Sequence, residues 1–141
     1  MGDDGNPVIA FEDALLTHRP HEHHTVITVE GELGVYEAPA LRDQLTALID
    51  QVEGDVVLNM LAVNYLDSTS LGVLVGALLR LRQQPARALH VVSAEGLVHK
   101  VLRITGLAKV FDLHPTVADA LQAASLPPPA ADGPHPLNPE A

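Results

Sequence analysis

Strand-length apolar runs alternate with amphipathic helical patterns along most of this 141-residue chain. In the clearest case, the apolar run VVLNML at 56–61 is followed by 68–82, where leucine or valine recurs with the spacing of one helix face. Two parallel strands joined by a helix form a crossover that lays the helix over the sheet. The alternation therefore predicts an α/β domain with a mainly parallel sheet.

The remaining elements follow from similar patterns. The first two strands are joined by a short polar stretch, 17–24, so we predict a mixed, mainly parallel sheet covered by about four α-helices in a single domain. Ser93 and Thr116 suit helix N-cap positions, and Gly106 suits a helix C-terminus. Further strands are expected at 8–16, 25–29, 88–92 and 110–113, and further helices at 39–52, between Ser93 and Gly106, and from Thr116 through 121.

The folded part is expected to span 7–125. Hydrophobic residues make up 47% of the chain, which is enough to build a packed core. Six of the eleven prolines fall within 127–141, where large apolar residues are almost absent. Because such segments cannot bury enough surface to offset their ordering entropy, we predict a flexible N-terminus at 1–6 and a disordered Pro-rich tail at 126–141.

The charge balance argues against several classes of partner. Eight Lys and Arg residues face 18 Asp and Glu residues, for a net charge of −10, and aromatic residues make up 3%. Phosphate backbones are bound by clustered basic residues, and single-stranded bases stack on aromatic rings. We therefore expect no direct nucleic-acid binding. No run approaches the roughly 18 apolar residues of a membrane span, and the N-terminus is acidic, which predicts a cytoplasmic protein without membrane insertion.

Signals for catalysis are missing from the sequence. The absence of cysteine excludes thiolate zinc sites, iron–sulfur clusters and a cysteine nucleophile. The chain has no Walker loop, no GxSxG and no GxGxxG after a strand. A serine hydrolase built on Ser68 or Ser70 would need a paired histidine and acid, and no spacing favours one. We predict a protein that is not an enzyme and needs no cofactor.

The segment Asp67-Ser68-Thr69-Ser70 stands where the second helix begins. Asp, Ser and Thr side chains accept hydrogen bonds from the unpaired N–H groups of a helix N-terminus, so capping explains the segment on its own. A second interpretation is compatible with the first. The helix continues with small residues that leave part of its surface smooth and open to a partner, namely Gly72, Val73, Gly76 and Ala77.

On these residues the chain resembles the STAS domains, and within them the bacterial anti-sigma-factor antagonists. Their signature is similar to a hydrophobic strand followed by D-S-[ST]-G-L-G at the start of the second helix, which matches residues 67–72 here. The resemblance covers about 8–124. It also includes Val29–Leu33 leading into Ala38–Leu41, the stretch VHKVLRITGL at 98–107, and Val110-Phe111 before the closing helix.

The resemblance implies a partner switch. In the family, the unphosphorylated antagonist binds an anti-sigma factor, itself a serine-protein kinase of the GHKL type, and thereby frees a sigma factor. Phosphorylation of the hydroxyl residue two places after the Asp ends this binding. Carried over to this chain, the phosphoacceptor is Thr69, with Ser68 and Ser70 as alternatives. The implied partner-binding residues are Asp67, Ser68, Thr69, Ser70, Gly72, Val73 and Gly76.

Three residues depart from the family pattern. Gly34 follows Gly-Glu-Leu where an Asp is usual, Asn59 replaces an Asp in the preceding strand, and Ser70 replaces a Gly. These departures bear on the kinase reaction more than on the fold. Two alternatives therefore stay open: a constitutive, non-phosphorylated STAS scaffold subunit of a transport or stress-signalling complex, and a STAS domain that binds a small ligand.

Histidines cluster between the first two predicted strands. His18, His21, His23 and His24 lie close together in sequence with Glu22, and imidazoles at such spacing bind Zn²⁺ or Ni²⁺. The expected loop offers no framework that would fix tetrahedral geometry. We therefore predict no metal site, and leave metal binding by 18–24 as an open alternative.

Overall fold

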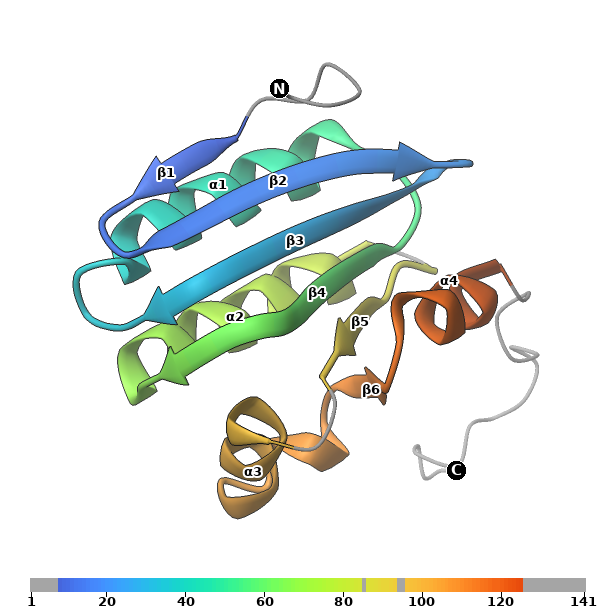
Figure 1. Cartoon of the computed structure of the whole chain (residues 1–141). Coiled ribbons are helices and arrows are strands. Elements are labelled where there is room, and N and C mark those ends of the chain that lie inside the picture. Colours follow the sequence, from blue (N-terminus) through green and yellow to red (C-terminus); the bar gives the residue numbers. More distant parts are fainter. Residues whose placement is uncertain (1–7, 85, 94–95, 126–141) are drawn as a thin grey trace.

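One mixed sheet of six strands organises the computed structural model, which describes residues 8–84, 86–93 and 96–125 (Figure 1). The strands lie in the sheet in chain order. The first three pair antiparallel, and the third to the sixth pair parallel. They are β1 (Ile9–Phe11), β2 (Ala14–His21), β3 (His24–Leu33), β4 (Val56–Leu66), β5 (Leu89–Val92) and β6 (Asp112–His114).

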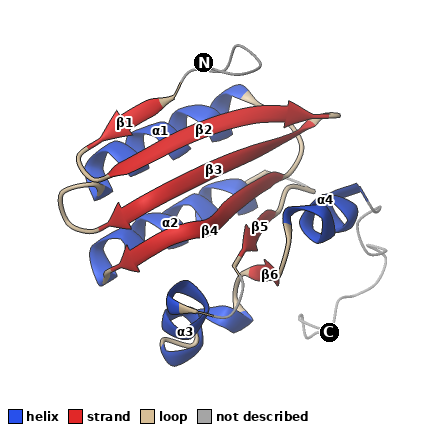
Figure 2. Cartoon of the chain, in the orientation of Figure 1, coloured by secondary structure: helices blue, strands red, loops and turns tan. Residues whose placement is uncertain are grey.

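Four α-helices pack around this sheet (Figure 2). The first two lie side by side on one face, the fourth lies on the other face, and the third lies beside β4 (Figure 1). This arrangement confirms the predicted mixed, mainly parallel sheet with about four helices. The helices are α1 (Ala38–Gln51), α2 (Ser68–Arg82), α3 (Leu97–Ile104) and α4 (Val117–Ser125), with a 3₁₀ turn, η2 (Leu107–Lys109), after α3.

The two faces of the sheet carry separate hydrophobic clusters. Leu58 and Met60 of β4 point into the main core with the buried leucines of α1 and α2. Val57, which lies between Val56 and Leu58, points to the opposite face and packs in a smaller cluster with Ala120 of α4. This alternation follows from the two-residue period of a strand. It explains why β4 reads as a nearly continuous apolar run at its start.

The N-terminal hairpin differs from its prediction. The expected strand at 8–16 is two strands, because the chain turns at Glu12, whose φ of 54° is left-handed. The polar stretch 17–24 is not a loop. β2 continues to His21 and β3 begins at His24, so the connection is only two residues long. Polar residues are tolerated there because β2 is covered incompletely and backbone pairing to β3 forms regardless of side chain.

The helix ends were predicted with mixed success. The Ser93 cap is wrong, because α3 begins later and Gly96 occupies its N-cap position. Ser93 instead directly follows β5, and its N–H donates to the carbonyl oxygen of His114 at 3.0 Å. Thr116 does cap α4, since its Oγ1 accepts from the N–H of Asp119 at 3.0 Å. Gly106 follows α3 with φ 81°, as expected for a helix C-terminus.

The predictions for 1–6 and 126–141 lie outside the described residues. Among the residues that the structure describes, no helix is long and apolar enough to cross a membrane.

Candidate functional site

The site begins where two parallel strands end together. Leu33, the last residue of β3, is the register partner of Leu66, the last residue of β4. The loops that lead into α1 and α2 therefore leave the sheet side by side at its carboxyl edge. The N–H of Asp67 donates to the carbonyl oxygen of Leu33 at 3.1 Å and joins the two loops at their start.

Asp67 caps α2, as the sequence predicted. Its backbone is extended, and its Oδ1 accepts from the N–H groups of Thr69 and Ser70, both at 3.1 Å. These two N–H groups have no acceptor within the helix, so the carboxylate satisfies donors that would otherwise need water. The cap fixes the first turn of α2 and therefore the directions of the hydroxyls at 68–70.

Ser70 differs from the two hydroxyl residues before it. Ser68 and Thr69 are exposed, whereas Ser70 has 0% of its surface accessible. The Ser70 hydroxyl donates to the carbonyl oxygen of Gly34 at 3.2 Å. This burial contradicts the expectation that Ser70 contacts a partner or offers an alternative phosphoacceptor. Ser70 is the third residue of α2. Side chains three and four residues apart lie on one face of a helix, and this position lies on the buried face.

Glu37 is a site residue that the sequence analysis missed. It stands just before α1, and its side chain is only 3% exposed. Its Oε1 accepts from the N–H of Gly34 at 2.9 Å, and its Oε2 accepts from the N–H of Asp13 at 3.1 Å. The carboxylate thus fastens the β3–α1 loop to the β1–β2 turn. Glu37 stands at the N-cap position of α1 but its side chain makes no cap hydrogen bond, so a capping pattern gave no signal for these two contacts.

Gly34 is surrounded closely enough that any larger residue would require its neighbours to shift by a few tenths of an ångström. A Cβ there would lie 3.1 Å from Tyr65 Cε2 and 3.2 Å from Asp67 Oδ2, with Glu37 Oε1 at 3.5 Å. An aspartate at this position would add a third carboxylate beside two others. The third departure from the family pattern, Asn59, lies within β4, where its Oδ1 accepts from the N–H of Leu61 at 3.1 Å.

A groove of about 600 Å³ runs between α1 and α2 and reaches the exposed hydroxyl residue Thr69. Gly72, Val73 and Gly76 line it, so three of the predicted partner-binding residues share one surface with Thr69. A Cβ added at Gly72 or Gly76 would meet nothing within 4 Å, which leaves this side of α2 open. Ala77 is buried in the core cluster.

Large apolar side chains are exposed around the same end of α2. Tyr36 is 78% exposed and Val35 is 56% exposed in the β3–α1 loop, and Tyr65 is 47% exposed at the end of β4. Single exposed apolar residues are common, but several together mark an interaction surface. We call the following set the tip surface: Val35, Tyr36, Tyr65, Ser68, Thr69, Gly72, Val73 and Gly76.

The histidines do not share one loop as the sequence suggested. His18 and His21 lie on β2, His23 lies in the turn, and His24 begins β3. Ligand atoms of Glu22, His23 and His24 lie within 4.8 Å of one another. However, His24 Nδ1 accepts from the N–H of Asp55 at 2.9 Å, so the neutral ring carries its proton on Nε2. This arrangement counts against His24 as a metal ligand.

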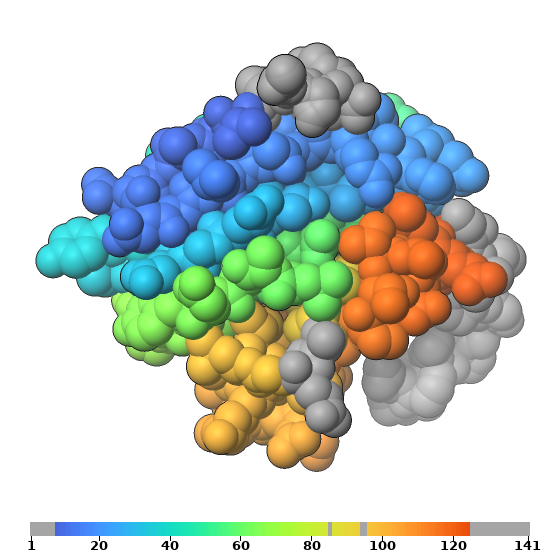
Figure 3. Space-filling model, viewed as in Figure 1, coloured from blue at the N-terminus to red at the C-terminus, as the bar shows by residue number. Residues whose placement is uncertain are grey.

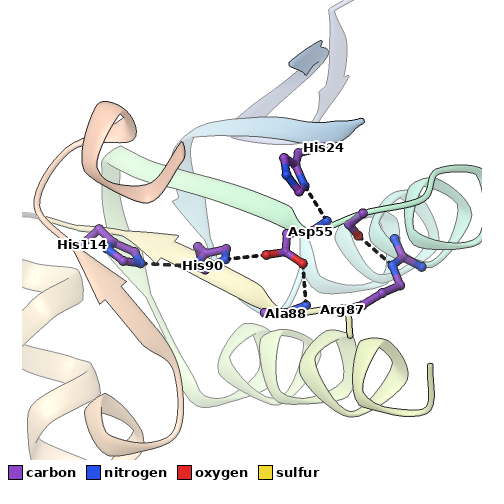
Figure 4. Close-up of polar contacts among 7 residues, drawn as sticks. His24, Asp55, Arg87, Ala88, His90 and His114 are labelled. Carbon is purple, nitrogen blue, oxygen red and sulfur yellow. Dashed lines mark hydrogen bonds and ion pairs between the residues drawn. The ribbon is translucent and has the colours of Figure 1, made fainter. Parts of the chain in front are cut away.

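A second polar cluster lies at the amino edge of the parallel strands, at the other end of β4 (Figure 4). Asp55 Oδ1 accepts from the N–H of Ala88 at 3.0 Å, and Asp55 Oδ2 lies 2.9 Å from His90 Nε2. His90 Nδ1 in turn lies 3.1 Å from His114 Nε2. Arg87 donates to the carbonyl oxygen of Gly54 at 2.7 Å beside this chain.

The cluster shifts the pKa values of its members. Burial acts to raise the pKa of Asp55, but the hydrogen bonds from His90 and Ala88 outweigh it and hold that pKa below its usual value. Burial lowers the pKa of His114, and the neighbouring His90 adds to this effect. Both shifts favour a cluster in which Asp55 is ionised and His114 is neutral.

The fold and the first turn of α2 define a STAS domain. The STAS domain family model matches residues 16–120, and the chain belongs to this family. The anti-sigma-B factor antagonist of Bacillus subtilis is 33% identical over 98 residues, which cover 67% of this chain and 85% of that protein. The anti-sigma-B factor antagonist of Staphylococcus aureus is 36% identical over 81 residues, covering 57% and 74% respectively.

A solved structure supports the same relationship. The crystal structure of an anti-sigma factor antagonist from Mycobacterium paratuberculosis superposes with a TM-score of 0.71 at 27% identity. The match covers 87% of this chain and 97% of that one. The family resemblance inferred from residues 67–72 is thereby confirmed.

Proposed function

We propose that this protein is an anti-sigma-factor antagonist, which binds an anti-sigma factor through the tip surface and is switched off by phosphorylation of Thr69. The observation that carries the proposal is the position of Thr69, which is exposed on the first turn of α2 and lines the groove between α1 and α2. A kinase can reach such a hydroxyl, and a partner seated in the groove would cover it.

Thr69 is favoured over the other two hydroxyl residues on structural grounds. Ser70 is buried, and its hydroxyl is engaged with Gly34. Ser68 is exposed but is not among the residues that line the groove. A phosphate on Thr69 therefore has the greatest effect on a partner that occupies this groove.

Charge explains how phosphorylation would act on binding rather than on folding. A phosphothreonine carries about −1.5 to −2 charges at neutral pH, and a helix N-terminus tolerates an anion. At an interface, however, the phosphate would lie near the Asp67 carboxylate. Of the two cations in the groove, Arg80 is already paired with Asp50 at 2.7 Å, which leaves Arg42. An incompletely compensated charge in an interface costs roughly 2–5 kcal/mol of binding free energy.

The closing experiment uses the anti-sigma factor captured with this protein from its native host and then purified. Calorimetric titration should show Thr69→Glu binding at least tenfold more weakly than wild type and Thr69→Ala within about twofold. Incubation with the kinase and labelled ATP should mark wild type and Ser68→Ala but leave Thr69→Ala unlabelled.

Two outcomes would contradict the switch. Label retained in Thr69→Ala and lost in Ser68→Ala would move the phosphoacceptor to Ser68. Full binding by Thr69→Glu, together with no labelling, would favour the constitutive scaffold. One observation favours that alternative: the N–H groups of Thr69 and Ser70, which could otherwise bind a phosphate, already donate to Asp67.

A further inference from the structure

Basic residues are concentrated in 80–111, which holds six of the eight Lys and Arg residues and one acidic residue, Glu95. The segment 96–111, which includes α3 and η2, is the later part of this stretch. It contains three of the eight Lys and Arg residues and none of the 18 Asp and Glu residues. The rest of the sequence therefore has 5 basic and 18 acidic residues. A local positive surface on a chain of net charge −10 is a charge asymmetry of the kind that selects partners.

These basic side chains are exposed on α3 and η2, at the periphery of the molecule. Figure 3 shows α3 and the following turn projecting below the sheet. Lys100, Arg103 and Lys109 are exposed, and none forms an ion pair with any residue in the described ranges. Unpaired cations at this position are available to an external carboxylate.

Apolar side chains are exposed between the cations. Ile104 is 75% exposed, and Leu97 lies seven residues earlier on the same face of α3, with Lys100 between them. Val110, which follows η2, is also exposed. The opposite face of α3 is anchored by Val98 and Leu102 in the main core, so the exposed residues are not needed for folding. We call the following set the basic surface: Leu97, Lys100, Arg103, Ile104, Lys109 and Val110.

We infer that the basic surface docks a short acidic segment of a partner protein, with carboxylates for Lys100 and Arg103 and apolar side chains for Leu97 and Ile104. This surface is separate from the tip surface, and the inference does not depend on the proposed function. Charge complementarity, together with aliphatic residues that lie exposed between the cations, specifies an amphipathic acidic peptide.

The surrounding charge argues for a short segment over an extended polyanion. A duplex nucleic acid or an anionic membrane would bring phosphates against the acidic remainder of the chain as well, where interactions reach about 8 Å at physiological ionic strength. A peptide of a few turns fits within the basic surface itself. Two copies of this chain, each of net charge −10, would repel each other.

The test measures fluorescence anisotropy of a labelled sixteen-residue peptide in which Glu and Leu alternate at helical spacing. A second peptide with Lys in place of every Glu is the control ligand. We expect the acidic peptide to bind wild type, the basic peptide not to bind, and Lys100→Glu/Arg103→Glu to weaken binding at least tenfold. Ile104→Ser should weaken it severalfold, because it removes the apolar contact without changing charge.

A matched variant tests whether position or net charge matters. Arg19→Glu/Gln51→Glu/Gln122→Glu makes the same change in net charge at exposed positions on β2, α1 and α4, and should leave affinity for the acidic peptide within about twofold. Thermal melts of both variants check that they stay folded. Equal loss of affinity in both, or no binding by wild type, would overturn the inference. Binding to phosphatidylglycerol vesicles that requires Lys100 and Arg103, without peptide binding, would overturn it in favour of a lipid surface.

Discussion

The hydroxyl of Ser70 donates a hydrogen bond to the carbonyl oxygen of Gly34, 36 residues away in the chain. The same carbonyl oxygen accepts from the N–H groups of Glu37 and Ala38. One backbone oxygen therefore joins the loop before α1 to the first turn of α2. Ser70, which departs from the family signature, therefore holds the first turn of α2 in place from its buried side.

Substitution of Ser70 by alanine should lower the free energy of unfolding by about 1 kcal/mol, the net value of one buried hydrogen bond. The loss stays moderate because Gly34 keeps its two backbone donors. Urea denaturation measures it. Ser68→Ala, on the exposed side of the same turn, is the matched control and should stay within about 0.5 kcal/mol of wild type. Equal stability of the two variants would show that the bond contributes nothing.

Replacement of Glu37 by alanine should cost more. It leaves the buried N–H group of Gly34 without its acceptor and also removes the part-buried hydrogen bond from the N–H group of Asp13, for about 2–4 kcal/mol of unfolding free energy. Glu37→Gln keeps one acceptor oxygen and should lose less. Glu53→Ala removes an exposed carboxylate and serves as the control in the same denaturation series. A Glu37→Ala protein with wild-type stability would mean that water replaces the carboxylate without penalty.

Substitution of Gly76 by leucine should fill the groove without damage to the fold. A Cβ at Gly76 meets nothing within 4 Å, and leucine favours a helix over glycine by about 0.5–1 kcal/mol. Circular dichroism should therefore show a folded domain that is at least as stable as wild type. Calorimetry should show affinity for the anti-sigma factor reduced at least tenfold. Ala118→Leu, at an exposed position of α4, adds similar bulk elsewhere and should bind normally.

Stability should fall as the pH is lowered from neutrality. Burial lowers the pKa values of His24 and His114 from 6.5, so the unfolded chain takes up these protons first and stability is lost progressively below about pH 6.5. The pKa of Asp55 is held below 3.8, so its contribution is present above that value and is lost under more acidic conditions. Urea midpoints between pH 5 and pH 7.5 measure the histidine part.

His114→Gln provides the comparison for this pH series. It removes one of the two histidines with lowered pKa values, so the slope of stability against pH should become shallower. His18→Gln, on β2 outside the cluster, should keep the wild-type slope. An unchanged slope in His114→Gln would assign the pH dependence to other groups.

Sequence patterns were most informative where local chemistry decides the structure. The helix predicted at 68–82 begins and ends at those residues, because an Asp cap and an aliphatic stripe are both local signals. The polar hairpin was mistaken for a loop because strands with an exposed face tolerate polar residues, so composition there does not distinguish the two. Burial of Ser70 likewise depends on the loop that packs over it rather than on the DSTS segment itself.

Long-range polar contacts were beyond the reach of the sequence. Asp55 and His90 are 35 residues apart, and His90 and His114 are 24 apart. They meet because β4, β5 and β6 lie in parallel register, which fixes which residues become neighbours. Nothing in the local context of any one of them indicates a partner. Glu37 was missed for a similar reason, since one of its two donors lies 24 residues earlier.

Two sets of side chains with different roles lie near opposite ends of β4. The polar cluster that Asp55 forms with His90 and His114 starts just before its first residue, and the tip surface begins at Tyr65 near its last. Asp55 and Tyr65 are ten residues apart, which is roughly 33 Å along an extended strand. Substitutions at that distance, with no shared contacts, usually add independently. Paralogues of this domain could therefore change the acid tolerance of the fold without changing partner choice, and change partner choice without losing acid tolerance. Selection can act on each property in turn, through residues at opposite ends of a single strand.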